Sequence, residues 1–345
     1  MAVAGERMAA EIAEQPAVFD AIVARRAELA AVAERLMAPR PRFALLAARG
    51  SSDHAASYMK YLIEILLELP AGLVSPSTTT LYGAEPDLAG VLYVTVSQSG
   101  GSPDLVEATK AARRLGALTV AVTNTPGSPL AEVAEHAVHL GAGEERAVAA
   151  TKTYTATLLT TYLLVDAARG GSGEAAAGLG ELAAATLGGS ADAVSAAADR
   201  YRAIERVVTT GRGYSSATAA EAALKLAETS YLGARAYSGA DLLHGPVAAI
   251  DAGTGVVAVT SKGYGGEAMR DVVAAVGERG AEVLAVGSAA GEMPASARID
   301  VPATAEEIAP IVEVLPLQRL ALELSLARGG DPDRPRGLSK VTRTR

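Results

Sequence analysis

Short, unbroken runs of apolar residues recur along the chain, and most are followed by a glycine-containing loop and a helix-like stretch. Phe43–Ala47 leads to the loop 48–52 and an amphipathic helix expected from about Asp53 to Leu69. Val91–Val96 leads to the loop 97–102 and a helix that opens at Pro103. Apolar runs of this length are typical of parallel strands that are buried on both faces of a sheet. The alternation of such strands with helices predicts an α/β fold.

The second half of the chain repeats the pattern of the first. Val207–Thr210 is followed by the loop 211–215 and a helix expected from about Ala217 to Tyr231. The Arg-Gly pairs at 49–50 and 212–213 mark the same place in the two halves, and at the same offset the second strand of the first half falls on Val256–Val259. We therefore predict two tandem doubly wound domains, each with a parallel sheet covered on both faces.

The repeat also suggests where the domains begin and end. A helical segment with a polar face precedes the first strand, and a stretch rich in glycine and alanine separates the two halves. The expected organisation is an N-terminal helical segment 1–38, a first domain 39–172, a connector 173–199, a second domain 200–330 and a C-terminal tail 331–345.

Composition excludes several classes of function. The 345 residues include two Phe and no Trp, and the formal net charge is -8, so a nucleic-acid partner is disfavoured. With no cysteine, the chain has no disulfide, thiolate metal site or thiol nucleophile. The four histidines form no metal-binding pair, and we expect neither a metal nor a cofactor.

Nothing in the sequence points to export or to a membrane. The first fifteen residues carry acidic side chains and lack the apolar core of a signal peptide. No apolar run approaches the roughly 20 residues that cross a bilayer. We therefore expect a cytoplasmic protein with no membrane partner.

The loop Ser97–Ser102 carries three hydroxyls and two glycines between a strand and a helix. Glycines let backbone N–H groups approach a ligand, and the following helix presents its positive end. Ser102 alone would suffice as an N-cap ahead of Pro103, so the other hydroxyls exceed what capping needs. No Gly-Lys-Ser/Thr follows, as a P-loop would require. The loop predicts a phosphomonoester site, whereas the equivalent 260–263 has lost most hydroxyls and is interpreted as a structural relic.

Glu221, Lys225 and Glu228 recur at positions that share one face of a helix. A solvated salt-bridge stripe is one interpretation. The neighbouring positions are alanine and leucine, however, and these residues favour burial. The flanking pattern therefore favours a charged face that lines a cleft.

These motifs, in this order, resemble the sugar isomerase (SIS) domain family over nearly the whole chain. The resemblance is strongest to the isomerase half of glucosamine-6-phosphate synthase and to stand-alone glucosamine-6-phosphate deaminases of the SIS type. Besides the serine loop, the matching stretches are Glu11–Pro16, Ala150–Thr153, Glu221–Glu228, His244–Pro246, Leu315–Gln318 and Arg334–Lys340.

The resemblance implies roles for individual residues. Glu228 would move a proton between C1 and C2 of the open-chain sugar, with Glu221 and Lys225 assisting. His244 would open the sugar ring and reach into the neighbouring subunit's site, which implies a homodimer with shared active sites. Lys340, which by sequence alone lies in a short, solvated basic tail, would form an imine with the ketose carbonyl. The residues implied to contact the phosphate or sugar are Ser52, Ser97, Gln98, Ser99, Ser102, Val148 and Ala150.

Some positions depart from the synthase pattern. Ala150 stands where the synthase has a serine, Leu243 where it has a lysine, Asp241 where it has a glutamate and Arg49 where it has a cysteine. The chain also lacks the cysteine with which the synthase's glutaminase domain releases ammonia. The type of reaction is therefore better specified than the substrate.

The leading hypothesis is an enzyme that converts glucosamine 6-phosphate to fructose 6-phosphate and ammonia, acting on a hexosamine 6-phosphate as partner. One alternative is a dehydratase of N-acetylglucosamine 6-phosphate, which abstracts the C2 proton and expels the C3 hydroxyl. Another is a deglycase of a glycated amino acid 6-phosphate, whose carboxylate Arg49 would meet. A non-catalytic sugar-phosphate sensor is disfavoured because Glu228, His244 and Lys340 are retained.

Overall fold

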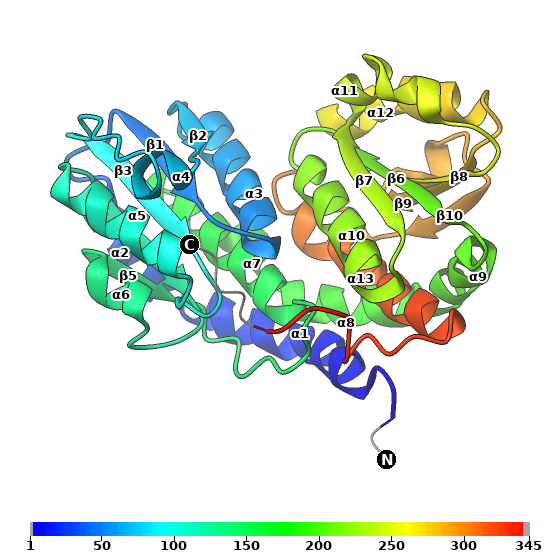
Figure 1. The fold of residues 1–345 in the computed structure, drawn as a ribbon, viewed down its shortest axis with the longest axis horizontal. Helices are drawn as coiled ribbons and strands as arrows, with labels where there is room; N and C mark the ends of the chain where they lie inside the picture. Colours follow the sequence, from blue (N-terminus) through cyan, green and yellow to red (C-terminus); the bar gives the residue numbers. More distant parts are fainter. Residues whose placement is uncertain (1–2, 341–345) are drawn as a thin grey trace. The chain divides into compact units, whose positions relative to one another are not determined.

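The computed structural model of the protein describes residues 3–340 (Figure 1). Contacts divide the chain into two compact units, each with one five-stranded parallel sheet. The first-sheet unit comprises Ala17–Glu145, Lys152–Ala177 and the tail from Ser339. The second-sheet unit comprises the segment up to Pro16, Arg146–Thr151 and Gly178–Leu338. The predicted α/β fold with two tandem parallel-sheet domains and N-terminal helices is confirmed.

The first-sheet unit has the strand order β2-β1-β3-β4-β5. Its strands are β1 (Phe43–Ala47), β2 (Ala71–Leu73), β3 (Val91–Val96), β4 (Leu118–Thr123) and β5 (His136–His139). Its helices are α2 (Arg26–Leu36), α3 (Ser51–Leu66), α4 (Ser77–Thr80), α5 (Pro103–Arg114), α6 (Pro129–Val133) and α7 (Lys152–Ala168), with a short 3-10 turn η1 (Glu174–Ala176). Helix α1 (Glu6–Ala24) is shared between the two units.

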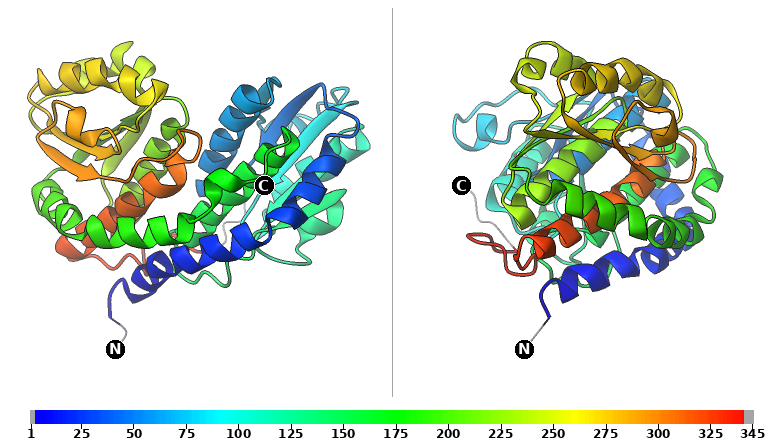
Figure 2. Two further views of the ribbon diagram at one scale, coloured as in Figure 1. Left: turned by 180° about the vertical axis from the view of Figure 1, so that it is seen from behind. Right: turned by 90° about the vertical axis from the view of Figure 1, so that its right-hand side faces the viewer.

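Both faces of this sheet are covered, as its apolar runs predict. Every residue of β3 is buried. Helices lie on both sides of the sheet (Figures 1 and 2). Val91 and Tyr93 pack in a cluster with Leu105 of α5, while Leu92 and Val94 line a space together with residues of α2, α3 and α7. A parallel strand in the middle of a sheet has no solvent-facing side, which explains its continuous apolar sequence.

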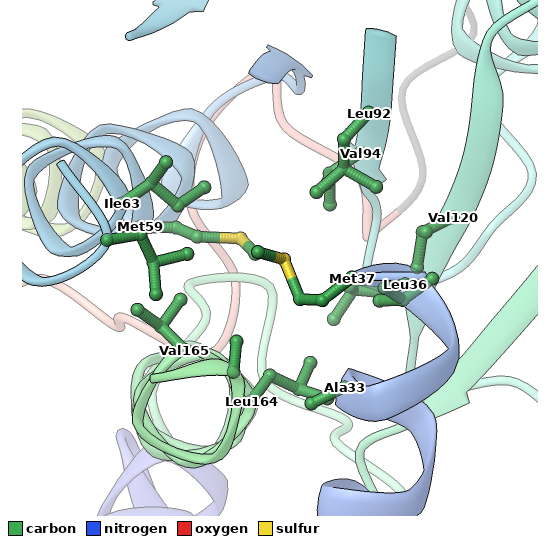
Figure 3. Close-up of a pocket in the computed structure, with 13 residues that line it drawn as sticks. Ala33, Leu36, Met37, Met59, Ile63, Leu92, Val94, Val120, Leu164 and Val165 are labelled. Atoms are coloured by element: carbon green, nitrogen blue, oxygen red, sulfur yellow. The ribbon is translucent and has the colours of Figure 1, made fainter. Parts of the chain in front are cut away.

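A small apolar cavity remains between α2, α3, α7 and the sheet (Figure 3). Its volume is about 30 Å³, and the side chains of Met37 and Met59 approach each other across it. A space of this size holds no more than a methylene group or one water, and its walls offer no polar partner. The cavity is therefore a packing gap in the core, too small for a sugar phosphate.

The second-sheet unit has the strand order β10-β9-β8-β6-β7. Its strands are β6 (Arg206–Gly211), β7 (Gly233–Ser238), β8 (Thr254–Val259), β9 (Glu282–Gly287) and β10 (Ala297–Asp300). Its helices are α8 (Leu179–Gly189), α9 (Ala191–Tyr201), α10 (Ser215–Ser230), α11 (Gly239–Leu243), α12 (Tyr264–Gly277) and α13 (Ala309–Ala327), with short 3-10 turns η2 (Pro246–Ala249) and η3 (Ala290–Glu292).

Each face of the second sheet again has its own helices. Val256 and Ala258 pack with Met269 and Val272 of α12 and with α11. On the opposite face, α10 lies against β6, β7 and β8 and packs along α13, while α9 contacts β10. Helix α10 is thus held between a sheet and a second long helix, and it carries the predicted catalytic stripe.

The strands lie where the apolar runs predict them, but two helices begin earlier than expected. Both α3 and α10 start two residues before the predicted positions, at Ser51 and Ser215. Serine is tolerated in a first helical turn, so these serines, expected in the preceding loops, belong to the helices instead. Among residues 3–340, no helix combines the length and the apolar composition needed to cross a membrane.

Candidate active site

The ends of two neighbouring strands in the first sheet present the predicted phosphate loop. β1 and β3 are adjacent, and the chain continues from β1 to β2 on one side and from β3 to β4 on the other. In α/β sheets, ligands bind at the carboxyl ends of the strands where the strand order reverses in this way. We call this place the first switch point. The loops or helix starts that flank it carry Ser52, Ser97, Gln98, Ser99 and Ser102.

Two helices begin at the first switch point, so the positive ends of their dipoles lie there. α3 starts at Ser51, which places Ser52 in its first turn, and α5 starts at Pro103. Gly100 turns the chain between strand and helix with a φ of 60°. A Cβ at this position would stand 2.1 Å from Ser128 Oγ, so only glycine fits. The backbone and the helix ends together favour an anionic ligand.

Backbone contacts, and not helix capping, place the serine hydroxyls of the loop. Ser97 Oγ accepts from the Gly100 N–H at 3.2 Å, and Ser99 Oγ accepts from the Gly101 N–H at 3.3 Å. A hydroxyl that accepts a hydrogen bond keeps its own proton for donation. Ser102 occupies the N-cap position but makes no side-chain capping bond. The hydroxyls are thus arranged so that they can donate to a phosphate.

Three further contacts hold the loops around the first switch point. The Gln98 carbonyl accepts from the Asn124 N–H at 3.0 Å and from Thr123 Oγ1 at 3.2 Å. Arg49 Nη2, in the loop after β1, lies 2.9 Å from the buried Asp104 Oδ2 in the first turn of α5. The guanidinium that would meet a substrate carboxylate in the deglycase hypothesis is therefore already paired.

Lys340 is docked within the first-sheet unit. Its Nζ lies 2.7 Å from Glu145 Oε2, and the Glu145 side chain is fully buried. Thr153, in the first turn of α7, donates to the same carboxylate from its N–H at 3.0 Å and from its Oγ1 at 2.6 Å. The interpretation of the tail as solvated, taken from sequence alone, is wrong at this position because a buried carboxylate holds the ammonium.

The preceding part of the tail is also anchored, in the second-sheet unit. Asp333 accepts from the N–H groups of Arg7 and Met8, at 2.8 and 3.0 Å, in the first turn of α1. The Arg336 guanidinium lies 3.8 Å from the centroid of the Tyr231 ring, in a cation–π contact. The chain that leads to Lys340 is therefore held at several points.

The matching stretches Glu11–Pro16 and Leu315–Gln318, to which the resemblance assigns no role, hold the segment 146–151 in place. Glu11 accepts from two successive backbone N–H groups at the start of this segment. The Gln318 amide donates to the Thr151 carbonyl at 3.1 Å, and Gln15 donates to Gln318 at 2.9 Å. Reasoning from the sequence missed these positioning roles, since the partners are far apart in the chain. The segment that they hold carries Val148 and Ala150.

The charged stripe on α10 is an ion-paired cluster in a mostly buried setting. Lys225 Nζ lies 3.4 Å from Glu221 Oε1 and also donates to Glu228 Oε2. The side chains of Glu221 and Lys225 are almost fully buried, whereas the Glu228 side chain is 23% exposed. The solvated-stripe interpretation is therefore wrong. Lys225 stabilises two carboxylates, and Glu228 is the one that remains accessible.

His244 lies in a different part of the second-sheet unit. It follows α11 directly, and its N–H donates to the Asp241 carbonyl at 3.1 Å. The residue is exposed, and the neighbouring Leu243 side chain is 41% exposed. An exposed imidazole beyond the end of a short helix is accessible to other molecules.

The second sheet has its own switch point, between β6 and β8, and a carboxylate lies there. Glu313 of α13 accepts from Ser215 Oγ, at the start of α10, at 3.0 Å, and from Ser261 Oγ in the loop after β8. The side chain is buried. Burial raises the pKa of Glu313 to about 7, although both serine hydroxyls act in the opposite direction.

A second carboxylate occupies the start of α12 in the same region. Glu306 accepts from the backbone N–H groups of Tyr264 and Gly265, at 3.1 and 2.7 Å. Gly263 makes room for it, because a Cβ there would lie 2.3 Å from Glu306 Oε2. The N–H groups that could bind an external anion here are therefore already satisfied.

The chain matches known proteins along nearly its whole length. The SIS domain matches residues 40–167 and 201–328. A glutamine–fructose-6-phosphate aminotransferase (isomerizing) from Pyrobaculum aerophilum is 34% identical over 349 residues, covering 97% of this chain and 57% of the relative. The chain spans about half the length of the curated relatives that it matches, here and in Thermus thermophilus.

Solved structures match the fold of this chain over nearly its whole length. A protein from Silicibacter pomeroyi, described as a candidate phosphosugar isomerase, has a TM-score of 0.87 and 33% identity, covering 96% of this chain and 100% of that one. A glucosamine-6-phosphate deaminase from Thermotoga maritima has a TM-score of 0.78 and covers 98% of this chain and 99% of its own. Its identity is 20%, so this likeness concerns the fold alone.

Proposed function

Because the chain belongs to the SIS domain family, as the matches to both halves and a 34% identical relative show, we propose that it deaminates and isomerises glucosamine 6-phosphate to fructose 6-phosphate and ammonia. The observation that carries the proposal is the first switch point, where hydroxyls, glycines and two helix starts converge on one place. This chemistry suits a phosphate monoester. The names of the similar proteins, which act on amino-sugar or sugar phosphates, support the same substrate class.

Each residue group has a step in the proposed reaction. Ser52, Ser97, Ser99 and Ser102 donate to the 6-phosphate, with Gln98 beside them. His244 transfers the proton that opens the sugar ring, for which an imidazole is suited near neutral pH. Val148 and Ala150 lie near the sugar, where alanine leaves more space than the serine of the synthase.

The proton transfer at C2 belongs to Glu228, which is the accessible carboxylate of the α10 cluster. Glu228 removes the C2 proton of the open-chain aldehyde and returns a proton to C1, while a proton of the C2 amine passes to O1. This leaves a hydroxyl at C1 and an imine at C2. Lys225 keeps the carboxylate in place, and Glu221 balances the second side of the ammonium.

Lys340 completes the proposed reaction. The Lys340 ammonium gives a proton to the imine nitrogen, and the resulting amine attacks C2. A bond forms between Nζ and C2, a second proton passes from Nζ to the substrate nitrogen, and the bond from C2 to that nitrogen breaks to release ammonia. Water then adds to the lysine imine, releasing the ketose carbonyl and restoring the amine. The reaction needs no cofactor, since each step is a proton transfer or an addition and elimination at C2.

We further propose a homodimer in which His244 serves the partner's site. Its exposure and its place after a short helix support this arrangement.

The decisive experiment is one incubation with glucosamine 6-phosphate, deuterated at C2, read by mass spectrometry and by ammonia release. We expect ammonia, fructose 6-phosphate and loss or transfer of the label. N-acetylglucosamine 6-phosphate, included in parallel, would lose water if the protein were the dehydratase. Retention of the label with every hexosamine 6-phosphate would refute the enzymatic proposal and leave the sensor.

A further inference from the structure

We propose that Glu145 is the positioning residue for Lys340, fixing the ammonium of the tail lysine to the start of α7. This inference rests on the proposed role of Lys340 as the imine-forming amine. Neither the sequence motifs nor the similarity to known proteins gives Glu145 a role in this chain.

The contact between the two side chains is asymmetric in burial. Lys340 Nζ lies 2.7 Å from Glu145 Oε2, with the lysine side chain 25% exposed and the glutamate side chain 0% exposed. A buried carboxylate requires a compensating charge and hydrogen bonds, so the pair is held together more firmly than a surface pair. The exposed fraction of the lysine leaves part of it accessible to a substrate.

Glu145 is the rigid member of the pair. Thr153 binds its carboxylate through both the backbone N–H and Oγ1, and the positive end of α7 lies beside it. Burial alone would raise the pKa of a carboxyl, but the Lys340 ammonium and the Thr153 bonds outweigh it and hold the pKa of Glu145 below its ordinary value. The carboxylate is therefore ionised and fixed at neutral pH.

Lys340 is the flexible member. Its amine stands on a four-carbon chain with several rotatable bonds. Attack on the imine carbon C2 requires one direction of approach, and misplacement by about 1 Å can cost about 10²-fold in rate. A fixed anion that localises the amine removes this freedom before the substrate arrives.

The test is Glu145→Gln, which keeps the shape of the side chain and an oxygen for the Thr153 bonds but removes the charge. We expect kcat to fall by about 10²-fold while KM changes little, because the serine loop binds the phosphate independently. Borohydride trapping of a sugar on Lys340 should slow in parallel. The matched control is Glu144→Gln, which removes the same charge from the exposed neighbouring residue and should leave kcat unchanged.

A double substitution separates positioning from general damage. If Glu145 acts through Lys340, then adding Glu145→Gln to Lys340→Met lowers the residual rate no further. An additional loss of the size seen in the single variant would contradict the proposal. Should Glu145→Gln fail to fold, Glu145→Asp provides the same comparison, since it keeps the charge but withdraws it by one methylene.

A measurement that needs no turnover distinguishes failure of this proposal from failure of the proposed function. The rate of Lys340 acetylation by acetic anhydride is followed by peptide mass spectrometry, with the exposed Lys110 as internal reference. We expect Glu145→Gln to raise the relative rate at Lys340 several-fold. Faster labelling without any turnover in the parent protein would support positioning and refute the deaminase. Unchanged labelling together with unchanged kcat would overturn the positioning role.

Discussion

The buried carboxyl of Glu313 makes the stability of the protein depend on pH in a direction opposite to that of most carboxylates. Its folded-state pKa is raised to about 7 by burial, from an ordinary 4.5. Below about 4.5 the group is neutral in both states, so its contribution to stability is fully present. As the pH rises, the unfolded chain loses the proton first, and stability declines until the folded-state pKa is passed.

The size of the effect follows from the width of that window. A difference of roughly 2.5 pKa units corresponds to about 3 kcal/mol of unfolding free energy, lost between about pH 4.5 and pH 7. Glu313→Gln replaces the carboxyl by a permanently neutral group of the same shape, which can still accept from Ser215 and Ser261. The variant should therefore lack this part of the pH dependence.

The assay is urea unfolding at several pH values from 5 to 8, followed by circular dichroism. At each pH, the unfolding free energy of the variant is subtracted from that of the parent protein. This difference should fall by up to about 3 kcal/mol from pH 5 to pH 8. Glu278→Gln, an exposed glutamate next to α12, is the control and should leave the profile unchanged. A parent–variant difference that stays constant from pH 5 to pH 8 would refute the reasoning.

Three further predictions follow from other parts of the structure. Replacing each loop serine by alanine should weaken phosphate binding by about 1–3 kcal/mol in calorimetry, and unchanged affinity in the triple variant would exclude the loop as the phosphate site. Val165→Ile adds one methylene toward the cavity of about 30 Å³ and should raise the unfolding free energy by up to about 1 kcal/mol, whereas a lower melting temperature would show that the gap cannot accept it. Mixing inactive His244→Ala and Glu228→Gln proteins should restore part of the activity, and no recovery after confirmed subunit exchange would place both residues in one chain.

The sequence predicted most of the fold because the physics of a buried parallel strand is local. A run such as Val91–Val96 has no solvent-facing side, so its composition alone indicates its structure. The serine loop could be found for the same reason, since its hydroxyls and glycines are contiguous. Helix starts were less certain, because serine suits both a loop and a first helical turn.

The contacts that the sequence did not reveal all join distant segments. Glu11 lies more than a hundred residues from the backbone that it binds, and Gln318 lies further still. Lys340 looked like part of a solvated basic tail because its partner Glu145 becomes a buried acid only after folding. No periodicity or spacing encodes such pairs, and only packing brings them together.

The two switch points differ in what they already contain. At the first, serine hydroxyls and two helix starts lie at the strand ends, whereas at the second the carboxyl groups of Glu306 and Glu313 lie at the corresponding loop and helix starts. A carboxylate tethered by its own chain competes with an effective concentration in the millimolar range or above, which dissolved phosphate must exceed to displace it. The second half of the repeat therefore carries its own acceptors where the first half carries hydroxyl donors, and Glu306 and Glu313 join the starts of α12 and α10 to α13 and the loop that precedes it.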